Sequence, residues 1–119
     1  MFSLLAPSGL SAINLVNSTL LNSGDEVWVA DNIYGPNLEH LNNLQTRYGI
    51  QVKVYNPIDI DSFTPSEKAK LIWLEAAGSV SLEFPDLKKL VKKAKQFNLL
   101  IALDNTWGAG LAFNAFDFS

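Results

Sequence analysis

The sequence predicts an α/β fold in which a mostly parallel β-sheet carries helices on both of its faces. Short β-rich segments alternate with segments whose apolar residues recur at helical spacing, and this alternation is typical of right-handed β-α-β crossovers. Parallel sheets built from such crossovers are covered on both sides. The 119 residues, of which 48% are hydrophobic, have the usual size of one domain, so we expect residues 1–119 to form one domain or part of one.

The first strand and the first helix are expected at the start of the chain. Residues 2–6 form a short apolar run, which a proline, a serine and a glycine at positions 7–9 interrupt. The next segment predicts a helix whose apolar stripe consists of Leu10, Ile13, Val16 and Leu20. This helix ends near Asn22, and Gly24 can adopt the left-handed conformation that caps a helix.

The same pattern then repeats. Residues 26–30 are rich in β-forming side chains and predict a second strand. After a loop at residues 31–35, a second helix is expected, with an apolar stripe at Leu38, Leu41, Leu44 and Tyr48. Gly49 ends this helix, and residues 51–55 predict the next strand.

The second half of the chain adds two strands and one long helix. Residues 56–68 contain prolines and aspartates, so we expect a connection with at most a short helix. Residues 71–74 and 99–103 predict strands, and Pro85 opens an amphipathic helix between them. The positions of this helix expected to face inward are Leu87, Leu90, Val91, Ala94 and Phe97, and those expected to face water are Lys88, Lys89, Lys92, Lys93 and Lys95.

Composition argues against several classes of partner. The net charge of −3 is spread over mixed charges and gives no basic surface, so we expect neither nucleic acid nor a membrane as a partner. The chain has no cysteine and a single histidine, His40, which leaves no disulfide framework and no obvious zinc site. We expect His40 to be a surface or partly covered residue, and a cytoplasmic location fits the absence of cysteine. Asn17 begins a glycosylation-type triplet that we interpret as a chance match inside a helix.

The polar clusters of the sequence come directly after the expected strands. They lie at residues 8–9, 31–35, 75–79 and 104–107. Because the carboxyl ends of parallel strands meet at one edge of a sheet, and ligands of α/β proteins bind at that edge, we expect these clusters to surround a ligand crevice.

Each candidate residue at this edge has a structural alternative. Gly9 and Leu10 open a helix, where free N–H groups favour a phosphate, but a glycine there also suits a simple turn. The ring of Tyr34 could lie against a planar ligand, or it could be an ordinary buried packing residue. Asp104 could face a cationic partner, or it could cap the next turn of the chain.

Five motifs agree in order and spacing with one known family. They are Ser8-Gly9-Leu10-Ser11-Ala12-Ile13, Gly24-Asp25-Glu26-Val27, Asp31-Asn32-Ile33-Tyr34-Gly35, Leu74-Glu75 and Asp104-Asn105-Thr106-Trp107. Along nearly its whole length the chain resembles the cofactor-binding large domain of the fold type I pyridoxal-phosphate enzymes of cysteine and methionine metabolism. Residues 78–83 differ from the serine-asparagine-proline stretch of many members, and this form resembles the bacterial carbon–sulfur β-lyases of the family.

The resemblance implies pyridoxal 5'-phosphate as the cofactor and assigns its contacts. The backbone amides of Gly9 and Leu10 would hold the phosphate, Tyr34 would stack on the pyridine ring, and Asp104 would pair with the ring nitrogen. Ser79 stands where relatives have asparagine and would approach the phenolic oxygen. A carboxylate against the ring nitrogen keeps it protonated, so that the ring can take up the electron pair released at Cα.

The resemblance also implies a reaction and an assembly. The substrate would be the amino acid cystathionine, whose β-elimination gives homocysteine, pyruvate and ammonia in methionine biosynthesis, and the full-length enzymes would be homotetramers. The lysine that holds the cofactor in the family has no counterpart among the lysines of this chain. We therefore expect a truncated fragment with no catalytic residue of its own, inactive alone, with exposed strand edges that favour association.

Two other interpretations stay open. The chain could be a non-catalytic fragment that binds no cofactor productively. It could also be an unrelated doubly wound nucleotide-binding domain, although the glycine fingerprint and the downstream acidic residue typical of those domains are missing after the first expected strand.

Overall fold

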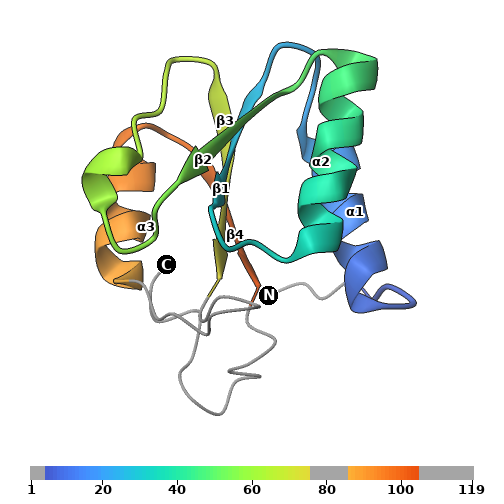
Figure 1. The fold of residues 1–119 in the computed structure, drawn as a ribbon, viewed down its shortest axis with the longest axis horizontal. Helices are drawn as coiled ribbons and strands as arrows, with labels where there is room; N and C mark the ends of the chain where they lie inside the picture. The colour runs from blue at the N-terminus through green and yellow to red at the C-terminus, as the bar shows by residue number, and fades with distance from the viewer. Residues whose placement is uncertain (1–4, 76–85, 105–119) are drawn as a thin grey trace.

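The computed structural model describes residues 5–75 and 86–104, and these residues form an α/β fold (Figure 1). Their four strands make one sheet in the order β2-β1-β3-β4, and every neighbouring pair is parallel. The strands are β1 (Glu26–Ala30), β2 (Gln51–Tyr55), β3 (Ala69–Glu75) and β4 (Leu100–Asp104). The predicted fold class is thus confirmed.

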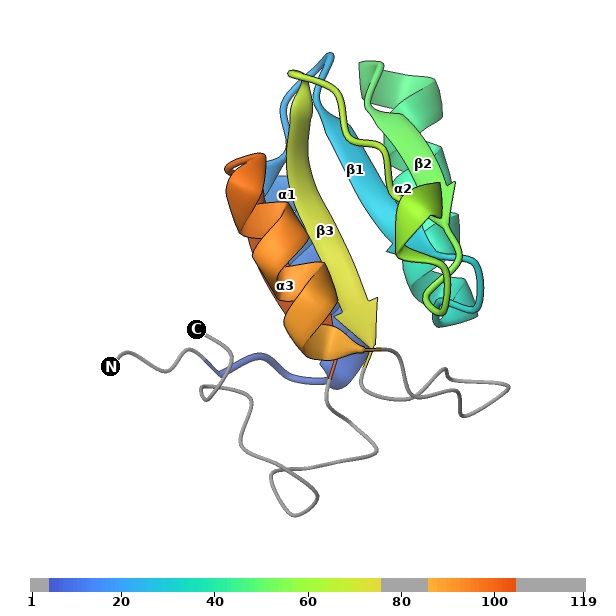
Figure 2. The ribbon, with the colours of Figure 1, turned by 90° about the vertical axis from the view of Figure 1, so that its left-hand side faces the viewer.

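Helices lie on both faces of the sheet, as Figures 1 and 2 show from two directions. One face carries α1 (Gly9–Leu20) and α2 (Gly35–Tyr48), and the other carries α3 (Leu87–Gln96) and the short 3-10 helix η1 (Ile60–Ser62). We call these the α1/α2 face and the α3 face. Within the described residues no helix is both long and apolar enough to span a bilayer.

The two faces take alternate residues of each strand. In β3, Leu71 and Trp73 pack on the α1/α2 face, whereas Ile72 and Leu74 pack on the α3 face. This is the two-residue period of an extended chain. All four side chains are buried, because the helices exclude water from both sides of the sheet.

Local sequence signals explain most helix ends. Ser8 caps α1, and Asp86 caps α3 by accepting a hydrogen bond from the backbone N–H of Lys89 at 3.2 Å. Gly49 has φ of 71° and ends α2, as predicted. Gly24 differs from its expected role: α1 is already ended by the extended Leu21, and Gly24, with φ of 87°, serves the turn that leads into β1.

Several apolar residues expected in the core are instead exposed. Tyr48 is 55% and Phe97 46% exposed, because each stands at the end of its helix, where the chain turns. The buried residues Ile50 and Leu99 come after these turns and fill the core in their place. Leu10, in the first turn of α1, is also partly exposed, although it was expected in the apolar stripe.

Lys93 also departs from its expected place in water. Its Nζ donates a hydrogen bond to the backbone oxygen of Ile60 at 2.9 Å and lies 5.6 Å from the ring centroid of Phe63. The long side chain thus covers apolar surface while its charge reaches a carbonyl. The other lysines of α3 are exposed, as predicted.

The expected first strand lies mostly outside the described residues. Of residues 2–6, only Leu5 and Ala6 are described; neither belongs to a strand, and Leu5 is 94% exposed. Within the described residues the sheet therefore ends at β4 on one side and at β2 on the other.

Candidate functional site

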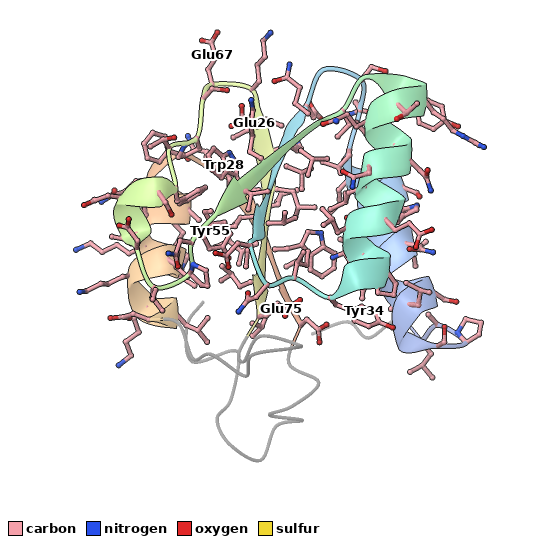
Figure 3. The ribbon with its side chains drawn as sticks, viewed as in Figure 1. Glu26, Trp28, Tyr34, Tyr55, Glu67 and Glu75 are labelled. Atoms are coloured by element: carbon pink, nitrogen blue, oxygen red, sulfur yellow. The ribbon has the colours of Figure 1, made fainter. Side chains whose placement is uncertain are left out.

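The carboxyl edge of the sheet brings together three segments that are far apart in the sequence. Tyr34, just after β1, and Glu75 lie at the same end of the sheet (Figure 3), and the backbone N–H of Tyr34 donates a hydrogen bond to Oε1 of Glu75 at 2.8 Å. Glu75 ends β3 and is the register partner of Asp104, which ends β4. The expected convergence of these polar clusters at one edge is therefore observed for Tyr34, Glu75 and Asp104.

Asp104 lines a groove between α1 and the edge strand β4. The groove has a volume of about 570 Å³ and is lined by Gly9 from the start of α1 as well as by Asp104. Its remaining wall is mostly apolar and includes Ile13, Val16, Trp73 and Ala102. An acidic residue and the first residue of a helix thus line one mostly apolar groove, which is the usual composition of a small-molecule site.

The first turn of α1 is a helix N-terminus capped by Ser8. The Oγ of Ser8 accepts a hydrogen bond from the backbone N–H of Ser11 at 3.1 Å, and the first hydrogen bond of the helix joins the N–H of Ala12 to the oxygen of Ser8. The N–H groups of Gly9 and Leu10 precede that bond, so the helix itself supplies them with no acceptor. A Cβ at Gly9 would meet no atom within 4 Å, so a ligand oxygen has room to approach.

Tyr34 is not the buried packing residue that one interpretation of the sequence allowed. It is 37% exposed and serves as the N-cap residue of α2, through its backbone rather than through its side chain. Glu75 fixes its position, because the buried carboxylate holds the Tyr34 backbone N–H. The sequence placed Glu75 in a polar cluster at this edge but did not predict the bond to Tyr34, although an acid at the end of a buried strand is a signal for such a bond.

Ser79 and residues 105–107, which complete the predicted clusters, lie outside the described residues. The predicted roles of Gly9, Leu10, Tyr34 and Asp104 toward a cofactor remain predictions; what the structure shows is where these residues lie. Within the described parts of the chain, no three His, Cys, Asp or Glu side chains are grouped so as to hold a metal ion.

Two other polar clusters lie away from this edge. At the opposite, amino edge, Glu26 accepts hydrogen bonds from the backbone N–H and the hydroxyl of Ser66 and from the indole of Trp28. Burial by itself raises the pKa of Glu26, but these hydrogen bonds and the charge of Lys53 outweigh it, so the pKa is lowered. This carboxylate is satisfied by its neighbours and ties the loop before β3 to β1.

The second cluster surrounds Asn17, which is fully buried between α1, α2 and β3. Its partners are Asn37, Trp73 and the partly covered His40. Burial lowers the pKa of His40. The burial of Asn17 also agrees with the interpretation of its glycosylation triplet as a chance match.

Solved enzymes share this fold. The fold matches that of cystathionine gamma-lyase from Lactobacillus plantarum complexed with L-serine, with a TM-score of 0.79 and 26% identity. The match covers 86% of this chain and 27% of that enzyme. An enzyme described as an O-acetylhomoserine (thiol)-lyase of Campylobacter jejuni, solved with N'-pyridoxyl-lysine-5'-monophosphate, matches with a TM-score of 0.73 and 26% identity over 82% and 25% of the two chains. The chain thus has the fold of part of the large domain of a fold type I pyridoxal-phosphate-dependent enzyme.

Comparison with known sequences identifies the family within this class of enzymes. The pattern of the Cys/Met metabolism PLP-dependent enzyme family matches residues 2–119, and the chain belongs to this family. It is 39% identical over 110 residues to cystathionine beta-lyase of Bordetella avium, covering 92% of this chain and 28% of that protein. The resemblance inferred from the motifs is confirmed, and the chain spans about 28% of the length of this relative.

The described residues fit the family's cofactor. A phosphate requires N–H donors, which the first turn of α1 offers, and a protonated ring nitrogen requires an acceptor such as Asp104. Gly9 and Asp104 line the same groove, so both ends of one ligand can be held there.

Proposed function

We propose that this chain is part of a pyridoxal-phosphate-dependent carbon–sulfur lyase. The proposed reaction is the β-elimination of cystathionine to homocysteine, pyruvate and ammonia. The observation that carries the proposal is the groove that Gly9, at the N-terminus of α1, and Asp104 both line. The identity to a cystathionine beta-lyase supports the choice of reaction. A cytoplasmic location, a role in methionine biosynthesis and a homo-oligomeric assembly are parts of the same proposal.

Different residues of the chain would contact different parts of the cofactor. The amides of Gly9 and Leu10 bind the phosphate, Asp104 accepts a hydrogen bond from the ring nitrogen, and the exposed ring of Tyr34 covers the ring face. When bound, the cofactor supplies an electron sink for the bond that breaks at Cα. Asp104 keeps the nitrogen protonated, and Glu75 positions Tyr34 through its backbone. Ser79 stays a predicted contact to the phenolic oxygen.

We further propose that the chain by itself does not turn over substrate. The reaction needs a base at Cα and a covalent anchor for the cofactor, and a lysine supplies both in this family. The lysines of the chain lie in β2, in the loop before β3, in β3 and in α3, and none of them lines the groove.

Titration of the chain with pyridoxal 5'-phosphate tests this function. The cofactor absorbance or the fluorescence of the chain should change on binding, and Asp104→Ala should weaken the affinity roughly tenfold, since it removes a charge-assisted hydrogen bond. Asp61→Ala is the matched control, because Asp61 is an exposed residue of η1 on the α3 face and its replacement should leave binding unchanged. Equal affinities of the chain and Asp104→Ala would refute the assigned role of Asp104.

The alternative function is a non-catalytic fragment that binds no cofactor productively. The absence of a lysine from the described lining of the groove favours it. A chain that gives no spectral change at any cofactor concentration, and that nevertheless unfolds cooperatively, would support this alternative over the lyase proposal.

A further inference from the structure

The buried amide of Asn17 joins the three elements of the α1/α2 face. Its Oδ1 accepts a hydrogen bond from the indole N–H of Trp73 on β3 at 2.8 Å, and its Nδ2 lies 2.8 Å from Oδ1 of Asn37 on α2. The same Nδ2 lies 3.2 Å from Nδ1 of His40, also on α2. Asn17 is 0% and Asn37 2% exposed, so water cannot replace these partners.

The chemistry of the partners fixes the direction of every hydrogen bond. An indole N–H can only donate, so the oxygen of the Asn17 amide must face Trp73. Its two amide hydrogens then point to Asn37 and to His40, and both of those atoms must be acceptors. His40 is therefore the neutral tautomer with its proton on Nε2. The network accepts only one orientation of the Asn17 side chain.

The other contacts that hold α1 among the described residues are mainly apolar. Ile13 is its one other buried residue, Val16 and Leu20 are partly buried and pack against the same core, and the groove separates part of α1 from β4. Apolar contact is not directional, so these side chains constrain the rotation and the axial position of α1 less sharply than directional bonds do. Hydrogen bonds with fixed directions define both.

We propose that Asn17 is a positioning residue that sets α1 on the sheet so that its N-terminal turn, at Gly9 and Leu10, faces the groove opposite Asp104. A helix is stiff over its length, so a rotation at Asn17 displaces the first turn about two turns away. This inference rests on the proposed function, because the purpose of the placement is to bind the cofactor phosphate there.

The test compares variants of the full 119-residue chain in their affinity for pyridoxal 5'-phosphate and for pyridoxal, which lacks the phosphate. Asn17→Ala should lose roughly tenfold in affinity for pyridoxal 5'-phosphate, the effect of one misplaced charge-assisted hydrogen bond, and little for pyridoxal. Asn17→Asp keeps the acceptor for Trp73 but places a buried carboxylate oxygen against Oδ1 of Asn37, and should have an effect at least as large as Asn17→Ala. A merely structural role would weaken binding of both compounds equally, and that result would overturn the inference.

Asn14→Ala is the matched control. Asn14 is the same residue type one turn earlier on α1, and its Oδ1 has no hydrogen-bond partner among the described residues. Its replacement should leave the ratio of the two affinities unchanged. An equal change of that ratio in Asn14→Ala would contradict the specific role of Asn17.

A measurement without ligand separates this inference from the proposed function. In two-dimensional 15N NMR spectra, Asn17→Ala should shift the indole resonance of Trp73 and the amide resonances of Gly9 and Leu10, whereas Asn14→Ala should leave the Trp73 indole unchanged. If the unmodified chain binds both compounds equally, the phosphate role fails, and these shifts alone decide the placement of α1. Unchanged Gly9 and Leu10 resonances in Asn17→Ala would overturn the inference. The same holds if the indole N–H of Trp73 in the unmodified chain exchanges with solvent as fast as an exposed indole.

Discussion

The α3 face of the sheet is held by apolar and aromatic contacts, whereas the α1/α2 face also contains the buried network around Asn17. On the α3 face the ring of Phe63 packs edge-on against Trp28, with centroids 5.1 Å apart, and against Tyr55 at 5.7 Å. On the other face, hydrogen bonds join two helices to β3. The groove with Asp104 lies on this second face. Hydrogen bonds occur on both faces, but those of Asn17 join two helices to a strand, whereas the buried bonds of Trp28 and Tyr55 on the α3 face end on Glu26 of β1 and on a backbone oxygen of β3.

The largest expected effect is on the α3 face. Leu90 is almost fully buried in the core under α3, so Leu90→Ala should lower the free energy of unfolding by about 2–5 kcal/mol through lost burial and a cavity. Urea denaturation measures the loss. The control Lys88→Ala, on the exposed side of the same helix, should change it by less than about 0.5 kcal/mol. Equal effects of the two variants would mean that α3 does not pack on the sheet.

The next effect is on the α1/α2 face. Trp73→Phe keeps an aromatic ring but leaves the buried Oδ1 of Asn17 without its donor, and should cost about 1–3 kcal/mol of unfolding free energy. In the double variant Trp73→Phe with Asn17→Leu, both polar partners are gone and part of the loss should be recovered. A double variant no more stable than Trp73→Phe, in the same denaturation experiment, would argue against the hydrogen bond as the source of the cost.

A smaller effect is expected for Tyr55→Phe. The Tyr55 hydroxyl donates a hydrogen bond to the backbone oxygen of Trp73 at 2.8 Å. Burial, helped by the charges of Glu75 and Asp31, raises the pKa of Tyr55, so the phenol stays protonated and remains a donor at neutral pH. Its loss should cost about 0.5–1.5 kcal/mol in thermal or urea unfolding. A cost as large as that of Leu90→Ala would show that the ring has repacked, rather than that one bond was lost.

The smallest effect concerns pH. Because the pKa of His40 in the folded chain lies below its ordinary value of about 6.5, the unfolded chain binds the proton more tightly. The contribution of His40 to the free energy of unfolding is complete above pH 6.5 and is lost as the pH falls toward the lowered pKa. The chain should therefore lose more stability between pH 7 and pH 5 than His40→Gln, which cannot titrate there. Parallel pH profiles of the two proteins, or an NMR titration of His40 at its ordinary pKa, would contradict this.

Much of the fold could be predicted because its signals are local. The alternation of strands and helices, the αL residue Gly49 and the inward face of α3 at Leu90 and Ala94 can all be inferred from short patterns. The errors lie at element ends, where Tyr48 and Phe97 turn outward and Gly24 serves a turn instead of a cap. At these positions one residue more or less of helix decides which side chain faces the core.

The candidate site was predictable to the extent that strand ends locate it. Tyr34 and Asp104 were found because parallel strands bring the residues at their carboxyl ends to one edge of the sheet. The hydrogen bond from Tyr34 to Glu75 was missed, because its two residues are 41 positions apart. The Asn17 network was missed for the same reason, since Trp73 is 56 positions away along the chain.

The sequence by itself determined the elements, the fold class and the family, because hydrophobic period, turn residues and short motifs are properties of neighbouring residues. Only the tertiary structure decided the strand order β2-β1-β3-β4, the groove shared by Gly9 and Asp104, and the amide contacts that place α1. These depend on which distant side chains meet once the sheet has formed, and no local pattern encodes such a meeting.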